Sequence, residues 1–518
     1  MNYNNLITLN EFFSKPNLEI IIPDFQRGYS WGKEQLNDLW EDLHNIRCGS
    51  FHYTGMLTLS KTPNSGSYNS FYVIDGQQRL TTLLILINEL LKKVTDGIVG
   101  VGEKSELVKK YLYEKPFGEI EYRYRFSYCN DDPSDEYFKT MILEKNSTGS
   151  KLVPQSTLYT NNLKAAKDYF AEKLQNLDEN EVKDLFCLIV DKLKFNEYQI
   201  ENMDEVYVTF ETMNNRGKEL STLELLKNRL VYLSTLFATT DSGQSQILRG
   251  HINNVWKTIY AFLGKDASKM LDDDQFLRDH WIMYFRYDRS VSKAYKHDLL
   301  HEEFVAKKVL NGELTLQEVD EYVQNLGRSV VIWFNINCPQ LSGYSPEIKG
   351  WLERLNHVGM GAFRPLIMSA LQCEGMAEDS IVRLLRACED FRFKISCLSG
   401  RRSNTSDTRF YRLANELFWN GIEDNPNYIA EVVEEQTAYW LDIDSFVKSM
   451  QERYDKMDGF YGWSGIRYLL YEYEKELQGK NDIKVDWKIF EENHKNKVSM
   501  KPSRAIPRFI TAVGVHSP

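Results

Sequence analysis

Two short polar segments near the N-terminus carry side chains suited to binding an anion. One is Ile22–Trp31 (IPDFQRGYSW) and the other is Ile74–Thr82 (IDGQQRLTT). Each contains an arginine, Arg27 and Arg79, and the planar guanidinium group donates paired hydrogen bonds that match a phosphate. We therefore expect the two segments to form two walls of one anion site.

The second segment follows the pattern of a strand, a turn and a helix. The apolar run Phe71–Ile74 predicts a strand, and apolar residues recur at helical spacing from Leu80 to Leu91. Gly76 lies between them, where it would let a phosphate approach the unpaired N–H groups of the helix N-terminus. Arg79 in the first helical turn opposes the helix dipole unless an anion or an acidic partner neutralises it. Its position therefore indicates such a partner.

A third polar segment, Asn214–Gly217 (NNRG), precedes another predicted helix. Ser221 and Glu224 have the spacing of a capping box, which fixes the helix start just after this segment. Asparagine amides can hydrogen-bond a base edge, and arginine can hold a phosphate. From this segment alone, however, we favour a plain turn at Gly217 with a surface ion pair at Arg216.

Length and composition limit the class of protein to which this chain can belong. With 518 residues, of which 42% are hydrophobic, the chain can form about two to four domains with sizeable cores. Its seven cysteines are scattered singly, without the spacing of a zinc site or a disulfide framework, so we expect them to be reduced. Neither a basic leader nor a run of about 20 apolar residues is visible, so we expect a cytoplasmic protein without a membrane span.

The net charge of −11 argues against a protein that coats nucleic acid non-specifically. The stretch Arg383–Arg412 is locally basic, and it is either a solvated helical surface or a contact for nucleic acid. The stretch Glu121–Tyr128 alternates basic and aromatic residues. We favour a half-exposed strand there over a base-stacking platform, because any such strand shows this alternation.

The chain is expected to combine an α+β N-terminal domain, residues 1–95, with a large and mostly α-helical remainder. Strand-like runs at 18–22, 51–59 and 71–74 alternate with helical patterns, and the turn-forming segment 60–70 predicts a hairpin loop. Beyond residue 100 helical patterns dominate. The remaining expected boundaries are a helical extension at 96–235, a helical domain at 236–490 and an irregular tail at 491–518.

The three motifs, in this order, resemble the GmrSD family of modification-dependent restriction systems. The resemblance covers residues 1–235 with specific motifs and extends more loosely to about 490. It implies an N-terminal domain similar to the ParB-like nuclease fold, with Asp75–Arg79 (DGQQR) in place of a nucleotide-binding motif. It also implies that this domain binds and hydrolyses a nucleoside triphosphate, and we expect Mg²⁺ to accompany the nucleotide.

On that resemblance we assign roles to the motif residues. Arg27 and Arg79 would clamp the phosphates. Gln77 and Gln78 would hydrogen-bond phosphate or sugar oxygens or position a water, and Asp75 would hold Mg²⁺, orient the attacking water or only cap the helix. The predicted catalytic residues are Asp75 and Gln78, with Asp75 also the metal ligand. The predicted nucleotide-binding residues are Gln26, Arg27, Gly76, Gln77, Arg79, Asn214, Asn215 and Arg216.

The C-terminus departs from the family pattern. Many relatives carry a His-Asn-His nuclease after the helical region, but here only His494 and His516 follow His357. Such a nuclease needs a histidine base and further metal ligands within one small fold. We therefore do not expect this chain alone to cleave DNA, and the tail suggests a truncated end or a nuclease that is a separate subunit.

The expected function is a nucleotide-binding, NTP-hydrolysing sensor of a DNA restriction or phage-defence system. Its expected partner is modified or foreign DNA, and self-association stays open. Three alternatives remain: a nuclease acting through the ParB-like domain, a DNA-binding adaptor without NTPase activity, and a core in which Asp75 and Arg79 merely pair with each other.

Overall fold

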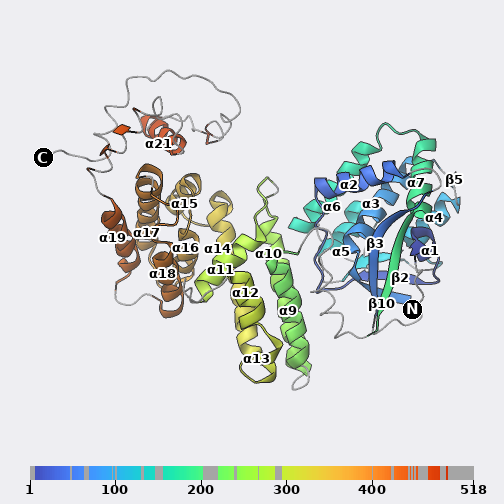
Figure 1. The fold of residues 1–518 in the computed structure, drawn as a ribbon, viewed down its shortest axis with the longest axis horizontal. Helices are drawn as coiled ribbons and strands as arrows, with labels where there is room; N and C mark the ends of the chain where they lie inside the picture. The colour runs from blue at the N-terminus through green and yellow to red at the C-terminus, as the bar shows by residue number, and fades with distance from the viewer. Residues whose placement is uncertain are drawn as a thin grey trace. The chain divides into compact units, whose positions relative to one another are not determined.

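The computed structural model describes residues 6–490 with gaps, the longest of which are 146–155, 202–219, 286–293, most of 442–464 and most of 479–489. The chain forms two compact units (Figure 1). Unit 1 comprises residues 1–338 and 414–419, and unit 2 comprises residues 339–413 and 420–518. Unit 1 begins with an α/β sheet domain and continues as helices, and unit 2 is helical in its described parts, which confirms the expected fold class.

A six-stranded mixed sheet, with strand order β1-β10-β3-β4-β2-β9, forms the centre of the N-terminal domain. Its strands are β1 (Leu6–Thr8), β2 (Leu18–Ile22), β3 (His52–Lys61), β4 (Asn69–Asp75), β9 (Phe126–Tyr128) and β10 (Leu193–Ile200). β3 and β4 pair antiparallel with Lys61 opposite Phe71, which confirms the predicted hairpin. β10 lies parallel to β3, and β9 lies parallel to β2. The sheet therefore continues well past residue 95, the expected end of this domain.

Helix α3 (Gln77–Lys93) is buried on almost every side, which its apolar residues on all faces explain. It contacts α4, α6 and α7. The other helices of this domain are α1 (Leu9–Phe13), α2 (Lys33–Asn45), α4 (Lys104–Tyr111), α5 (Pro133–Tyr137), the π-helix η1 (Phe138–Ile142), α6 (Leu158–Lys173) and α7 (Glu179–Lys192). Two small ribbons pair β5 (Ile98–Val99) with β6 (Gly102–Glu103), and β7 (Tyr113–Glu114) with β8 (Arg123–Tyr124).

The alternating segment 121–128 forms β8 and β9, which confirms the strand interpretation. Its rings Tyr124, Phe126 and Tyr128 are buried. The intervening arginines Arg123 and Arg125 form ion pairs with Glu114. The aromatic rings therefore belong to the core and are not available to stack on bases.

The rest of unit 1 is helical. Its elements are α9 (Thr222–Phe237), α10 (Ser242–Leu263), α11 (Asp273–Tyr284), α12 (Tyr295–His297), η2 (Asp298–Glu303), α13 (Ala306–Leu310) and α14 (Leu316–Asn337). α10 packs against both α9 and α14, and it also contacts α6 of the sheet domain. The side-chain amide of Asn161 in α6 donates to the carbonyl of Gly264, just after α10, at 3.0 Å.

Unit 2 contains η3 (Pro339–Leu341), α15 (Pro346–Val358), α16 (Phe363–Gln372), α17 (Glu378–Phe391), η4 (Arg392–Leu398), α18 (Asp407–Asn420), α19 (Tyr428–Trp440) and α21 (Ile466–Gln478). Residues 414–419 of α18 group with unit 1. α17 is central, because it contacts both α15 and α19. Among the described helices of both units, none has the length and apolar character needed to cross a bilayer.

Gly76 provides a test of how α3 begins. Its φ of +96° is left-handed, and a Cβ there would lie 3.0 Å from Leu57 Cδ1 and 3.1 Å from the Met56 carbonyl oxygen. Gly76→Ala is therefore expected to lower the free energy of unfolding of unit 1 by about 1–3 kcal/mol. The control Gly250→Ala, at an open position inside α10, should instead raise it by about 0.5–1 kcal/mol. Equal midpoints for the two variants in urea unfolding would contradict this account.

Candidate functional site

Side-chain amides join the first motif to the second. Gln26, in the loop after β2, donates from Nε2 to the carbonyl of Ile74 at 2.7 Å. Gln77, in the first turn of α3, donates from Nε2 to Oε1 of Gln26 at 2.8 Å. Both glutamines are buried. The two polar segments singled out in the sequence therefore lie together, and these contacts fix the loop against the start of α3.

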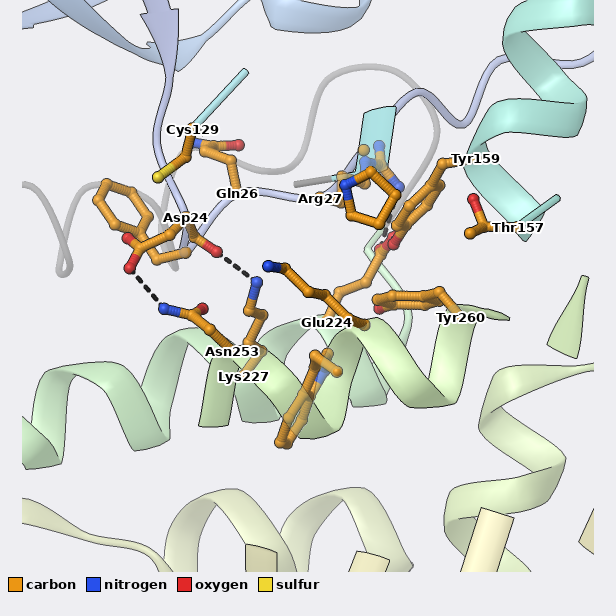
Figure 2. A pocket seen from close by; sticks show the side chains of 15 residues that line it. Asp24, Gln26, Arg27, Cys129, Thr157, Tyr159, Glu224, Lys227, Asn253 and Tyr260 are labelled. Carbon is orange, nitrogen blue, oxygen red and sulfur yellow. Dashed lines mark hydrogen bonds and ion pairs between the residues drawn. The ribbon is translucent and has the colours of Figure 1, made fainter. Parts of the chain in front are cut away.

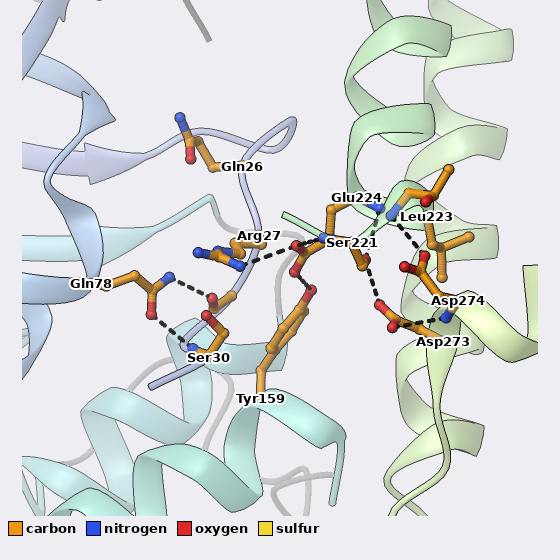
Figure 3. A network of polar contacts seen from close by, with 12 residues as sticks. Gln26, Arg27, Ser30, Gln78, Tyr159, Ser221, Leu223, Glu224, Asp273 and Asp274 are labelled. Atoms are coloured by element: carbon orange, nitrogen blue, oxygen red, sulfur yellow. Dashed lines mark hydrogen bonds and ion pairs between the residues drawn. The ribbon is translucent and has the colours of Figure 1, made fainter. Parts of the chain in front are cut away.

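Gln78 fixes the same loop further along (Figure 3). Its Oε1 accepts from the Ser30 N–H at 2.7 Å, and its Nε2 donates to the Gly28 carbonyl at 2.9 Å. Gly28 is packed so closely that a Cβ would lie 2.4 Å from the ring of Tyr159 in α6. Both the oxygen and the nitrogen of the Gln78 side-chain amide are thus hydrogen-bonded to backbone groups. The predicted catalytic role of Gln78 would require these hydrogen bonds to break.

Arg27 points from this loop to the start of α9. Its Nη1 lies 3.2 Å from Oε2 of Glu224, and the two side chains are only 5% and 8% exposed. The other carboxylate oxygen, Oε1, accepts from the Tyr159 hydroxyl at 3.0 Å. Glu224 is therefore held by a residue of the sheet domain and by α6, although it belongs to α9 (Figure 3).

The capping box predicted for Ser221 and Glu224 is confirmed. The Ser221 N–H donates to Glu224 Oε2 at 2.9 Å, and the Glu224 N–H donates to Ser221 Oγ at 3.3 Å. The start of α11 completes this arrangement, because Ser221 Oγ donates to Asp273 at 2.6 Å and the Thr222 N–H donates to Asp274 at 2.7 Å. Burial, with the nearby charges of Glu224 and Asp274, raises the pKa of Asp273 to about 6 against the hydrogen bond from Ser221.

Asp24 anchors the loop to α10 and α9. Arg249 donates to its two carboxylate oxygens at 2.7 and 3.0 Å, and Asn253 donates to it at 2.8 Å. Lys227 of α9 donates to its backbone carbonyl. Burial raises the pKa of this carboxyl, but the hydrogen bonds and charges of Arg249 and Lys227 outweigh burial and hold the pKa below its usual value.

These residues line a pocket of about 40 Å³ between the loop and helices α6, α9 and α10 (Figure 2). Its lining is Asp24, Phe25, Gln26, Arg27, Gly28, Cys129, Pro133, Thr157, Tyr159, Glu224, Lys227, Asn253, Trp256, Lys257 and Tyr260. The rings of Tyr159 and Tyr260 are in contact, with centroids 4.4 Å apart. Since one water occupies about 10–15 Å³ on this measure, the pocket has room for a few waters only.

Arg79 and Asp75 are placed differently from Arg27. Arg79 Nη2 donates to the Met56 carbonyl at 2.9 Å and lies 3.9 Å from Asp75 Oδ2. The two side chains are 28% and 32% exposed, so they pair with each other at a partly exposed site and not in a sealed core. Arg27 lines the pocket described above, but Asp75, Gly76 and Arg79 are not among its lining residues. We expected one cleft in which both arginines bind the phosphates, but only Arg27 lines this pocket.

The third motif cannot be placed. Asn214, Asn215 and Arg216 fall within 202–219, outside the described residues. Sequence reasoning passed over Asp24, Tyr159, Lys227 and Asn253 as site residues. Two of them gave a signal, because Asp24 stands within the first motif and Lys227 within the run Leu225–Asn228 (LLKN) that contributes to the family resemblance. Tyr159 and Asn253 come from helices far along the chain, and no local pattern marks them.

Replacing each motif arginine should separate their roles. Arg27→Met is expected to lower the free energy of unfolding by about 3–5 kcal/mol, because it leaves the Glu224 carboxylate buried without its cation. Arg79→Met, at the more exposed pair, should cost about 1 kcal/mol or less. The double variant Arg27→Met/Glu224→Met should recover part of the loss. Equal losses for the two single variants in urea unfolding would refute a structural difference between these pairs.

Asp273 predicts a pH dependence of stability. Its folded pKa of about 6 exceeds the ordinary 3.8, so between these values the folded state holds a proton that the unfolded state releases. The free energy of unfolding should therefore fall as pH rises across this window. Asp273→Asn keeps an acceptor for Ser221 without titrating, so it should gain stability over the wild type from pH 4 to pH 7. A constant difference between the two proteins over that range would contradict the prediction.

Comparison with known proteins agrees with the resemblance that the sequence motifs indicate. Residues 9–231 match the family described as the GmrSD restriction endonuclease N-terminal domain. An uncharacterized protein of Methanocaldococcus jannaschii is 25% identical over 236 residues, which cover 41% of this chain and 39% of that protein. The chain thus aligns with about two fifths of that relative's length. A domain of this family fits a component of a restriction or phage-defence system. Residues 9–231 of this chain are therefore similar to the N-terminal domain of the GmrSD restriction endonuclease family.

Proposed function

We propose that this chain is a nucleotide-binding, NTP-hydrolysing regulatory component of a DNA restriction or phage-defence system. The observation that carries the proposal is the convergence of Arg27, Lys227 and Lys257 on one pocket from the N-terminal loop, α9 and α10. Three cations drawn from separate segments suit a polyanion such as a triphosphate. The match of residues 9–231 to the GmrSD N-terminal domain supports the proposal that the chain belongs to such a system.

In this proposal the phosphates replace Glu224 as the partner of Arg27. A carboxylate and a phosphate both accept paired hydrogen bonds from a guanidinium group, so one can take the place of the other. The present cavity of about 40 Å³ is too small for a nucleotide, so entry requires the loop and the start of α9 to separate. Nucleotide binding would then loosen the tie between the sheet domain and α9, and hydrolysis would restore it.

Mg²⁺ would accompany the nucleotide. Within the described parts of the chain, no cluster of three or more His, Cys, Asp or Glu side chains could hold a metal ion. Mg²⁺ often needs only one or two carboxylates when phosphates supply further oxygens. Asp75, the ligand predicted from the sequence, does not line this pocket, so Mg²⁺ at Asp75 would accompany a nucleotide that lies at the N-terminus of α3. Bound there, the ion would offset charge on the phosphates.

A DNA-binding adaptor remains the second candidate, and the basic stretch 383–412 is the reason. Some of its arginines serve the fold: Arg383 pairs with Glu434 at 2.8 Å, and Arg392 donates to the Gly359 carbonyl at 2.7 Å. Arg401 stacks over Trp440, and both Arg401 and Arg402 are exposed. DNA, a separate nuclease subunit and a second copy of the chain all remain proposed partners.

The decisive experiment is a panel of nucleoside triphosphates with Mg²⁺, measuring binding by calorimetry and phosphate release. Lys257→Ala should weaken triphosphate binding about tenfold, because it removes one cation from the pocket lining. Lys164→Ala, an exposed lysine on α6, is the matched control and should bind as the wild type does.

Arg79→Ala tells the two candidate locations apart. If Arg79→Ala weakens binding while Lys257→Ala does not, the nucleotide lies at the N-terminus of α3 and not in the pocket. If no triphosphate binds the wild type, the adaptor is favoured. DNA retention should then be steeply salt-dependent and weakened by Arg401→Ala/Arg402→Ala.

A further inference from the structure

Unit 2 contains a second cavity, of about 200 Å³, which lies far along the sequence from all three motifs. It is formed by residues of α15, α17, η4 and α21. Its lining is Trp351, Arg354, Glu389, Phe393, Tyr468, Leu469 and Glu472. Three of these seven side chains are aromatic, and the polar ones are two carboxylates and one guanidinium group.

The aromatic side chains give the cavity flat walls. Phe393 and Tyr468 meet edge to face with centroids 5.4 Å apart. Trp351 belongs to α15 and has the Arg354 guanidinium 4.6 Å from its ring centroid. An apolar cavity of about 150 Å³ is enough to bind benzene. The volume here therefore suits a somewhat larger planar ring.

The carboxylates supply acceptors that the protein uses only in part. Glu472 Oε2 lies 3.0 Å from Arg354 Nη2, whereas its Oε1 is buried and receives no hydrogen bond from the described residues. Glu389 Oε1 accepts from the Tyr468 hydroxyl at 2.6 Å. A buried carboxylate oxygen without a donor is costly, so a ligand N–H that reached Glu472 would relieve that cost.

The charge of the cavity favours a neutral ligand over a cation. Arg354 already balances Glu472. Burial, with the charges of Asp390 and Glu472, raises the pKa of Glu389 against the opposing hydrogen bond from Tyr468 and the charge of Arg354. A raised pKa disfavours the ionised form of Glu389, and this reduces the negative charge that would attract an ammonium group.

We propose that this cavity binds a nucleobase that carries an exocyclic amine, stacked beside Trp351 with its amino group donating to Glu472. Carboxylates accept hydrogen bonds from base amino groups, and each base stacked on an aromatic side chain gains about 1–3 kcal/mol. The base comes either from a free nucleoside or nucleotide, or from a nucleic-acid strand out of which it is turned. This site is separate from the phosphate-binding pocket proposed in unit 1.

The test titrates the full chain with cytidine, uridine, adenosine and guanosine, and with short single-stranded oligonucleotides of dC or dT, by calorimetry. Cytidine should bind about tenfold or more tightly than uridine, which presents a carbonyl where cytidine has the amine. Glu472→Gln should reverse this preference, because an amide N–H can donate to that carbonyl. Glu476→Gln, an exposed residue one turn further along α21, is the matched control and should leave the preference unchanged.

Trp351→Ala should weaken binding of every base, and a thermal melt will show whether unit 2 stays folded. Because nucleosides lack phosphates, Lys257→Ala should not affect them, so this test can fail or succeed independently of the nucleotide proposal. Binding of the dC oligonucleotide but not of cytidine identifies a base within a strand, whereas binding of both identifies a free base as sufficient. Equal affinity for cytidine and uridine, or a Glu472→Gln variant with wild-type preference, would overturn the proposal.

Discussion

A buried charge needs a partner of opposite charge, and Arg27 and Glu224 provide this for each other. The two residues are 197 positions apart in the sequence. Arg27 belongs to the loop after β2, whereas Glu224 belongs to the first turn of α9, and both are almost fully enclosed. Removing a guanidinium group from water is tolerable only with close compensation. This ion pair, together with the contacts of Asp24 with Arg249 and Asn253, joins the sheet domain to the helices that follow it.

The surrounding contacts make that ion pair specific. Gln26, Gln77 and Gln78 fix the loop that carries Arg27, so the guanidinium group has a defined direction. On the other side, the capping box with Ser221 fixes where α9 begins and therefore where Glu224 lies. A polar network of this kind is stable only when most of its members are satisfied. An anion that competes with Glu224 for Arg27 would therefore disturb the start of α9. Through Ser221 and Asp273 it would also disturb the start of α11.

The two units present different chemistry. The pocket of unit 1 gathers cations from three segments around a loop of the family motif, whereas the cavity of unit 2 has aromatic walls and carboxylate acceptors. The first arrangement suits phosphates and the second suits the face and edge of a base. Phosphate contacts provide affinity without reading sequence, and base contacts provide selectivity. A chain that combined both would respond to a nucleotide and to the identity of a base.

The sequence by itself determined the elements and the motifs. Period-two and helical patterns located β2, β4, α3 and α9, Gly76 marked the turn before α3, and Ser221 with Glu224 marked the start of α9, because each depends on neighbouring residues only. Tertiary structure decided the partners. β9 and β10 joined the sheet from beyond residue 95, Glu224 came to Arg27 from 197 positions away, and Arg79 turned to Met56 and Asp75 instead of the pocket. The strand order and the pairing of Arg27 with Glu224 depend on which distant segments meet once the core is packed, and no local pattern encodes that meeting. The contact of Arg79 with Asp75, four residues apart, is the exception, because the sequence already offered it as one alternative.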